Sequence, residues 1–72
     1  MTKLFDTDFV IYDKANDKPI RFAICDDIVV FGDKAEAEAD RRGDEVVIPT
    51  TELPLHWQKE LIDRIERNNQ PI

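Results

Sequence analysis

Few side chains in this chain could carry covalent catalysis. The 72 residues include no serine, one cysteine and one histidine, so a Ser–His–Asp triad is excluded. Cys25 and His56 remain as a candidate nucleophile and base. Cys25 is followed by Asp26 and Asp27, however, and negative charge nearby disfavours the reactive thiolate. We therefore predict a structural cysteine and a solvated histidine instead of a catalytic pair.

Carboxylates are the other groups with potential chemistry. Asp26 and Asp27, with Asp33 a little further on, are candidate ligands of Ca²⁺ or Mg²⁺. The ligand spacing of an EF-hand loop is absent, and adjacent carboxylates point in different directions, so a plain turn is favoured. Gly32 and Gly43 form no phosphate-binding pattern. The sequence thus predicts no catalytic residue, no metal ligand and no cofactor, and we expect a protein that is not an enzyme.

Negative charge is concentrated in the middle of the chain. The net charge is −6 overall, and residues 26–45 alone hold eight acidic and three basic residues, a net −5. Non-specific binding to nucleic acid requires a basic surface, so direct nucleic-acid binding is disfavoured. A basic protein partner, or solubility alone, is favoured.

The length and composition indicate one small domain. A chain of this size buries only about 60% of its unfolded surface and has no room for two cores, so we expect one domain over residues 1–72. Residues 1–7 are expected to fray, and residues 70–72 to form a tail. One cysteine excludes an internal disulfide and is typical of a reducing compartment. The acidic N-terminus is unlike a signal peptide, and no apolar run reaches the roughly 20 residues of a membrane span, so we expect a cytoplasmic protein without membrane contact.

The central elements follow from side-chain periodicity. Ile20, Phe22 and Ile24 alternate with smaller or polar residues, which predicts a strand over residues 20–25 that buries these three side chains on one face. Two aspartates then indicate a turn. Residues 28–31 are bulky on both faces and predict a second strand, covered on both sides.

A short acidic helix should follow. Asp33 and Glu36 fit a capping box in which the Asp33 carboxylate accepts a hydrogen bond from the Glu36 N–H group. We expect the helix to run to about Arg42 and to end at Gly43 as a left-handed residue. Two alanines four positions apart should face the sheet, namely Ala35 and Ala39. The other faces are then acidic.

Two further strands and a second helix complete the fold. Residues 8–13 alternate with Phe9 and Ile11 on one face, and residues 14–19 should form a hairpin turn to the next strand. Residues 45–49 predict a short fourth strand that Pro49 ends.

The last helix is the most amphipathic element. Thr50 or Thr51 should cap it, and Pro54 suits its first turn. Five apolar residues fall within an arc of roughly 160° at 100° per residue: Leu55, Trp57, Leu61, Ile62 and Ile65. This stripe should cover the sheet, and the helix should end within residues 68–71. The alternative is that Trp57 stays open as a docking site or a dimer seam, because tryptophan is enriched at interaction hot spots.

Three segments carry a resemblance: residues 9–13 (FVIYD), 29–47 (VVFGDKAEAEADRRGDEVV) and 53–62 (LPLHWQKELI). In these segments, and in the order of strands and helices, the chain resembles small uncharacterised proteins encoded by tailed bacteriophages. The resemblance covers most of the chain and implies a phage-encoded accessory factor. It brings no assigned activity and no functional residue.

The sequence therefore predicts an α+β domain in the order β-β-β-α-β-α, with a small, mainly antiparallel sheet of three to four strands and two helices. The leading hypothesis is a small, accessory or inhibitor-like protein that binds a basic protein partner. The candidate contact residues are Asp33, Glu36, Glu38, Asp40 and Trp57. One alternative is a nucleic-acid mimic that blocks a DNA- or RNA-binding enzyme. Another is a structural protein that self-associates as a homodimer.

Overall fold

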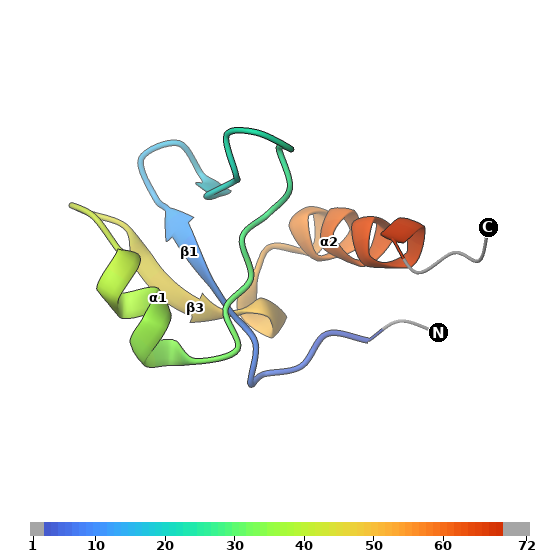
Figure 1. Ribbon diagram of the computed structural model, residues 1–72, viewed down its shortest axis with the longest axis horizontal. Coiled ribbons are helices and arrows are strands. Elements are labelled where there is room, and N and C mark those ends of the chain that lie inside the picture. Colours follow the sequence, from blue (N-terminus) through green and yellow to red (C-terminus); the bar gives the residue numbers. More distant parts are fainter. Residues whose placement is uncertain (1–2, 69–72) are drawn as a thin grey trace.

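The computed structural model describes residues 3–68 (Figure 1). The expected tail at residues 70–72 and the first two residues of the lead-in lie outside the described residues. The elements are β1 (Phe9–Asp13), β2 (Lys18–Pro19), α1 (Lys34–Asp40), β3 (Val46–Pro49), the 3₁₀ helix η1 (Thr50–Glu52) and α2 (Leu55–Asn68). The predicted α+β class with two helices is confirmed. The sheet has three strands.

Strand β1 is the centre of an antiparallel sheet with the order β2-β1-β3. Strand β3 pairs with four residues of β1, from Phe9 opposite Pro49 to Tyr12 opposite Val46. The other edge of β1 is shared. Strand β2 pairs with Tyr12 and Asp13 at one end, and Phe31 exchanges two backbone hydrogen bonds of 2.7 Å with Phe9 at the other.

The two faces of the sheet pack against different helices. Side chains alternate along a strand, so Val10 and Tyr12 lie on one face of β1 and Ile11 on the other, as predicted. Val10 and Tyr12 join a core with Leu61 of α2. Ile11 is fully buried outside that core, and α1 packs on β1 and β3 with its own fully buried Ala37. The sheet is therefore the middle layer between α1 and α2.

The predicted strand over residues 20–25 is wrong. The Ile20 N–H group still donates to the Ile11 carbonyl at 2.9 Å, but the chain then leaves β1. Phe22 is 52% exposed and Ile24 fully exposed, so neither enters the core. The reason is that Phe31 occupies the remaining edge of β1, and one strand edge can hydrogen-bond only one segment at a time.

Residues 28–31 do not form the strand predicted for them either. Ile28 pairs with Arg21 in one isolated bridge, and Phe31 pairs with Phe9 in another. Ile28 is buried, whereas Val30 is 41% exposed, so the segment is not covered on both sides. It crosses from the loop to β1 and is attached by these two bridges and by the Val29 N–H group, which donates to the Ile20 carbonyl at 3.2 Å.

Helix α1 begins where it was predicted and ends earlier. The Asp33 carboxylate caps it by accepting from the Ala35 N–H at 2.9 Å, one residue before the predicted partner. The helix ends at Asp40, and Arg41 is already extended. Gly43 has the predicted positive φ, +54°, but it lies in the turn after the helix and does not end the helix. The Glu45 N–H group closes this turn by donating to the Arg42 carbonyl at 3.0 Å.

The face of α1 that touches the sheet also differs from the prediction. Ala37 is buried, while Ala35 and Ala39 are exposed. Two positions along a helix correspond to roughly 200°, so α1 is turned about half a revolution from the expected orientation. This rotation points the acidic residues and two of the alanines to solvent.

Helix α2 covers the other face of the sheet, and most of its predicted stripe is confirmed. Leu61 is buried, and Trp57 and Ile65 pack against the same core. Leu55, however, is 76% exposed, because it is the first residue of α2 and Leu53 fills the core position ahead of it. Neither threonine caps α2: the buried Thr50 donates its hydroxyl to the Phe5 carbonyl at 2.8 Å, and Thr51 lies in η1.

Candidate partner-binding surface

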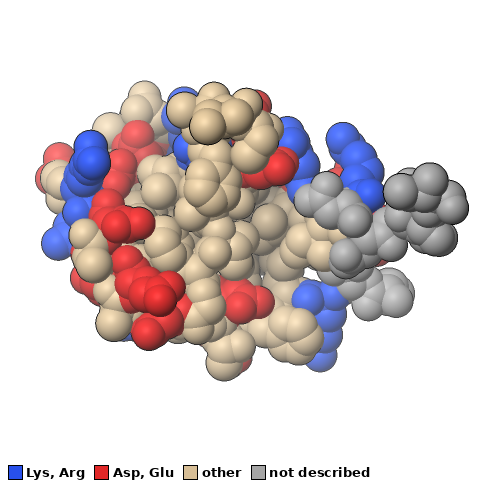
Figure 2. Space-filling view, in the orientation of Figure 1, with Lys and Arg blue, Asp and Glu red and all other residues tan. Residues whose placement is uncertain are grey.

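The acidic residues predicted as contacts lie together on α1. Asp33, at the cap of α1, and Glu36, Glu38 and Asp40 within it are all exposed. We call these four residues the α1 acidic surface. They are exposed because the single residue that α1 buries is Ala37, which points to the sheet. Figure 2 shows acidic side chains gathered over the part of the molecule where α1 lies.

Basic residues within and directly after α1, namely Lys34, Arg41 and Arg42, offset part of this negative charge. Arg41 lies 3.7 Å from Glu38, but its guanidinium also donates to the carbonyls of Gly43 and Glu45, both at 3.0 Å. Arg41 is thus held by the turn after the helix. Glu36 and Asp40 carry like charges four positions apart, which costs a few tenths of a kcal/mol. Asp33 stabilises α1 as its cap, whereas Glu36, Glu38 and Asp40 are exposed on the helix and fill no part of the core.

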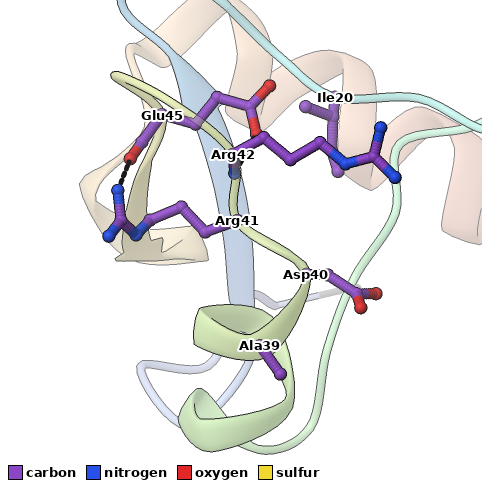
Figure 3. Close-up of a pocket in the computed structure, with 6 residues that line it drawn as sticks. All are labelled: Ile20, Ala39, Asp40, Arg41, Arg42 and Glu45. Carbon is purple, nitrogen blue, oxygen red and sulfur yellow. Dashed lines mark hydrogen bonds between the residues drawn. The ribbon is translucent and has the colours of Figure 1, made fainter.

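A hollow of about 380 Å³ adjoins the C-terminal end of α1. Six residues line it: Ile20, Ala39, Asp40, Arg41, Arg42 and Glu45. Figure 3 shows Arg42 extended across the hollow beneath Ile20, while Arg41 turns the other way towards Glu45. The lining holds two carboxylates and two guanidinium groups, and no serine, cysteine or histidine. The hollow therefore lies between α1 and the segment around Ile20.

Trp57, the fifth predicted contact residue, lies on α2 and not beside the α1 acidic surface. Its indole N–H donates to the Asp17 carbonyl at 3.2 Å, and the Arg21 guanidinium lies 5.1 Å from the centre of its ring. The ring also packs against the core. These contacts give Trp57 a structural role, since it joins α2 to the turn between β1 and β2 and to the next loop.

The two groups with shifted pKa values belong to that turn. A hydrogen bond to the Asp17 carboxylate, with burial as the second cause, raises the pKa of Tyr12 to about 12. The Asn16 side-chain amide donates to Asp13 at 2.7 Å and lowers the pKa of that carboxyl. Both shifts arise from contacts that close the hairpin.

The candidate catalytic and metal-binding residues are not assembled into a site. Cys25 is exposed at a loop tip and has no packing role, contrary to the structural role predicted for it. His56 is exposed, as predicted, with its ring 5.1 Å from that of Trp57. Asp27 pairs with Arg64, and Asp26 with Arg21. Within residues 3–68, no three His, Cys, Asp or Glu side chains are grouped to hold a metal ion.

Sequence reasoning missed an exposed apolar segment. Phe22, Ala23, Ile24 and Cys25 all lie on the surface at the tip of the loop between Arg21 and Ile28. Their alternation was interpreted as a buried strand face. The two aspartates directly after them indicate a turn, but the turn in the structure includes residues 23–25 as well, and no signal in the sequence marks that earlier start.

Comparison of the chain with protein-family models, with curated protein sequences and with solved structures found no match in any of the three. Among the described residues, neither helix has the length and apolar character needed to cross a lipid bilayer.

Proposed function

We propose that this is a small, non-enzymatic binding protein that presents the α1 acidic surface to a basic surface on another protein. The observation that carries the proposal is the exposure of four carboxylates on and beside a seven-residue helix. Within the described residues, their one ion pair is the 3.7 Å contact between Glu38 and Arg41. A partner's lysine or arginine side chains would supply the missing positive charge.

The physical role of such a surface is to accelerate and orient association. Complementary charges steer encounters and suppress wrong partners, and the effect weakens as salt screens it. The resemblance to small phage proteins supports a partner in the cytoplasm of a bacterial host, and the single cysteine fits a reducing compartment.

The test removes the charge without removing the helix. We expect the triple variant Glu36→Gln, Glu38→Gln, Asp40→Asn to recover much less partner from bacterial lysate than the wild-type protein does. Asp33 is kept because its carboxylate caps α1. The control variant Asp6→Asn, Glu52→Gln, Asp63→Asn changes the net charge from −6 by the same amount, at positions outside α1, and should recover partner normally.

Equal recovery by the wild-type protein and the α1 triple variant would contradict the proposal. Equal losses in both triple variants would assign the effect to net charge and would also contradict it. Added DNA provides a further arm: if DNA displaces the protein from its partner, the α1 acidic surface acts as a nucleic-acid mimic at a DNA-binding site.

A further inference from the structure

The loop between Arg21 and Ile28 presents apolar side chains to solvent. We call Phe22, Ala23, Ile24 and Cys25 the apolar tip. All four are exposed, with Ile24 fully exposed and Phe22 52% exposed. Surface loops are normally polar, and a run of exposed apolar residues at a loop tip is unusual unless it binds something.

Hydrogen bonds within the loop fix the shape of the tip. The Asp26 N–H donates to the Phe22 carbonyl, and the Phe22 N–H donates to the Asp27 carbonyl, both at 2.9 Å. Asp26 adopts a left-handed conformation with φ of 57°, which aspartate tolerates better than most residues. The apolar side chains therefore lie on a closed turn whose backbone is held in place.

Ion pairs fasten the base of the loop to α2. Arg21 contacts Asp26 and Glu60, both at 3.1 Å, and Asp27 pairs with Arg64. The Arg21 guanidinium also lies over the Trp57 ring. The tip is thus anchored on two sides, and a preorganised loop loses little conformational entropy when it binds.

We propose that the apolar tip inserts into an apolar surface, bordered by lysine or arginine, on the same basic partner protein that α1 contacts. This inference rests on the proposed function. The loop and α1 adjoin a common hollow, because Ile20, two residues before the tip, lines it together with Ala39 and Asp40 of α1 (Figure 3). In Figure 2 the uncharged protrusion over this loop lies at the upper edge and the acidic side chains over α1 lie at the lower left, so the partner must span both.

Charge and size argue against a second copy of the chain or a lipid surface as the occupant. Two copies in contact would each bring a net charge of −6 and would set acidic surfaces beside one another. A bilayer with anionic lipids would repel the same charge. A stable interface buries about 800 Å² on each partner, more than four side chains provide, so the tip serves as an anchor within a larger contact.

A basic amphipathic helix is the minimal probe of this chemistry. The probe is a short peptide of leucine and lysine with all leucines on one face. The control peptide has the same composition in scrambled order, so that charge is equal and the apolar face is absent. We expect the wild-type protein to bind the amphipathic peptide more tightly than the scrambled one, measured by fluorescence anisotropy of the labelled peptides.

Substitution at the tip isolates its contribution. Ile24→Ser should weaken binding of the amphipathic peptide by about tenfold, the effect of leaving one large apolar side chain unburied, and should leave the scrambled peptide unaffected. The fold should be unchanged because Ile24 makes no core contact. Leu55→Ser, which removes another exposed apolar side chain, is the matched control and should bind as the wild-type protein does.

The outcomes separate this inference from the proposed function. If the α1 triple variant loses binding and Ile24→Ser does not, the tip inference is overturned and the proposed function stands. If Ile24→Ser loses binding and the α1 triple variant does not, the proposed function is contradicted. The lysine or arginine residues that the inference places around the apolar surface are then contradicted as well. If light scattering shows a dimer that Ile24→Ser abolishes, the occupant is a second copy and the inference is overturned.

Discussion

Asp17 shows how much one residue can decide in a small domain. Its carboxylate accepts the Tyr12 hydroxyl proton in a hydrogen bond, and its carbonyl accepts from the Trp57 indole at 3.2 Å. Its φ of 55° turns the chain between β1 and β2. One aspartate in a left-handed conformation therefore joins the hairpin to α2, and it lies within the turn that the sequence predicted.

Titration of Tyr12 tests this contact. The hydrogen bond to Asp17 and burial raise the pKa of Tyr12 from 10.0 to about 12, so the folded state favours the neutral phenol. The stability that this provides is complete below pH 10.0 and is lost as pH rises from 10.0 through about 12. Asp17→Asn, which retains the turn conformation, should lower the pKa of Tyr12. The chain has a single tyrosine, so tyrosinate absorbance reports it alone, and identical titrations in both proteins would contradict the contact.

At the scale of the element, α1 depends on its surroundings. A helix of seven residues is too short to be stable alone in water. It is held by the Asp33 cap and by the close packing of Ala37, whose small side chain lets the helix approach β1 and β3. Glu36, Glu38 and Asp40 are exposed and take no part in this packing, which agrees with a role in binding.

The orientation of α1 can be tested by enlarging one alanine at a time. Ala37→Leu should lower the free energy of unfolding by about 1–3 kcal/mol, because a buried position has no space for the larger side chain. Ala35→Leu should change it by no more than about 0.5 kcal/mol, since that position is exposed. Urea denaturation measures both. If Ala35→Leu lowered the free energy of unfolding more than Ala37→Leu does, the orientation predicted from the sequence, with Ala35 facing the sheet, would be supported instead.

At the scale of the whole molecule, Arg21 and Trp57 connect parts that the sheet does not. Helix α2 meets the sheet through Leu61 and its neighbours, and it meets the loop at Arg21 through Glu60 and Trp57. The side chain of Arg21 is only 23% exposed. The loop and α2 therefore hold one another in place, and the position of the apolar tip depends on α2.

Removing Arg21 should loosen this connection. Arg21→Ala should lower the free energy of unfolding by about 1 kcal/mol, from the lost cation–π contact and ion pairs, and should alter the fluorescence of the single tryptophan. Arg67→Ala removes an exposed pair with Asp63 at 3.6 Å and should have almost no effect on either quantity. Unchanged Trp57 fluorescence in Arg21→Ala would contradict the role given to Arg21.

Several features were predictable because they depend on neighbours in sequence. The alternation in β1, the turn around Asp17, the cap at Asp33 and the apolar stripe of α2 all follow from periodicity and local hydrogen bonding. The concentration of negative charge on α1 was predictable for the same reason, since exposure is the ordinary state of acidic residues. These features define the α+β class and the α1 acidic surface, but not the apolar tip.

Competition between distant segments was decided only in the tertiary structure. The alternation from Ile20 to Ile24 is compatible with a strand, but a strand needs a partner edge, and Phe31 occupies the one beside Phe9. The chain consequently leaves the sheet, and the residues expected in the core become the exposed apolar tip. A sequence states which residues can be buried, whereas the limited area of sheet determines which of them are.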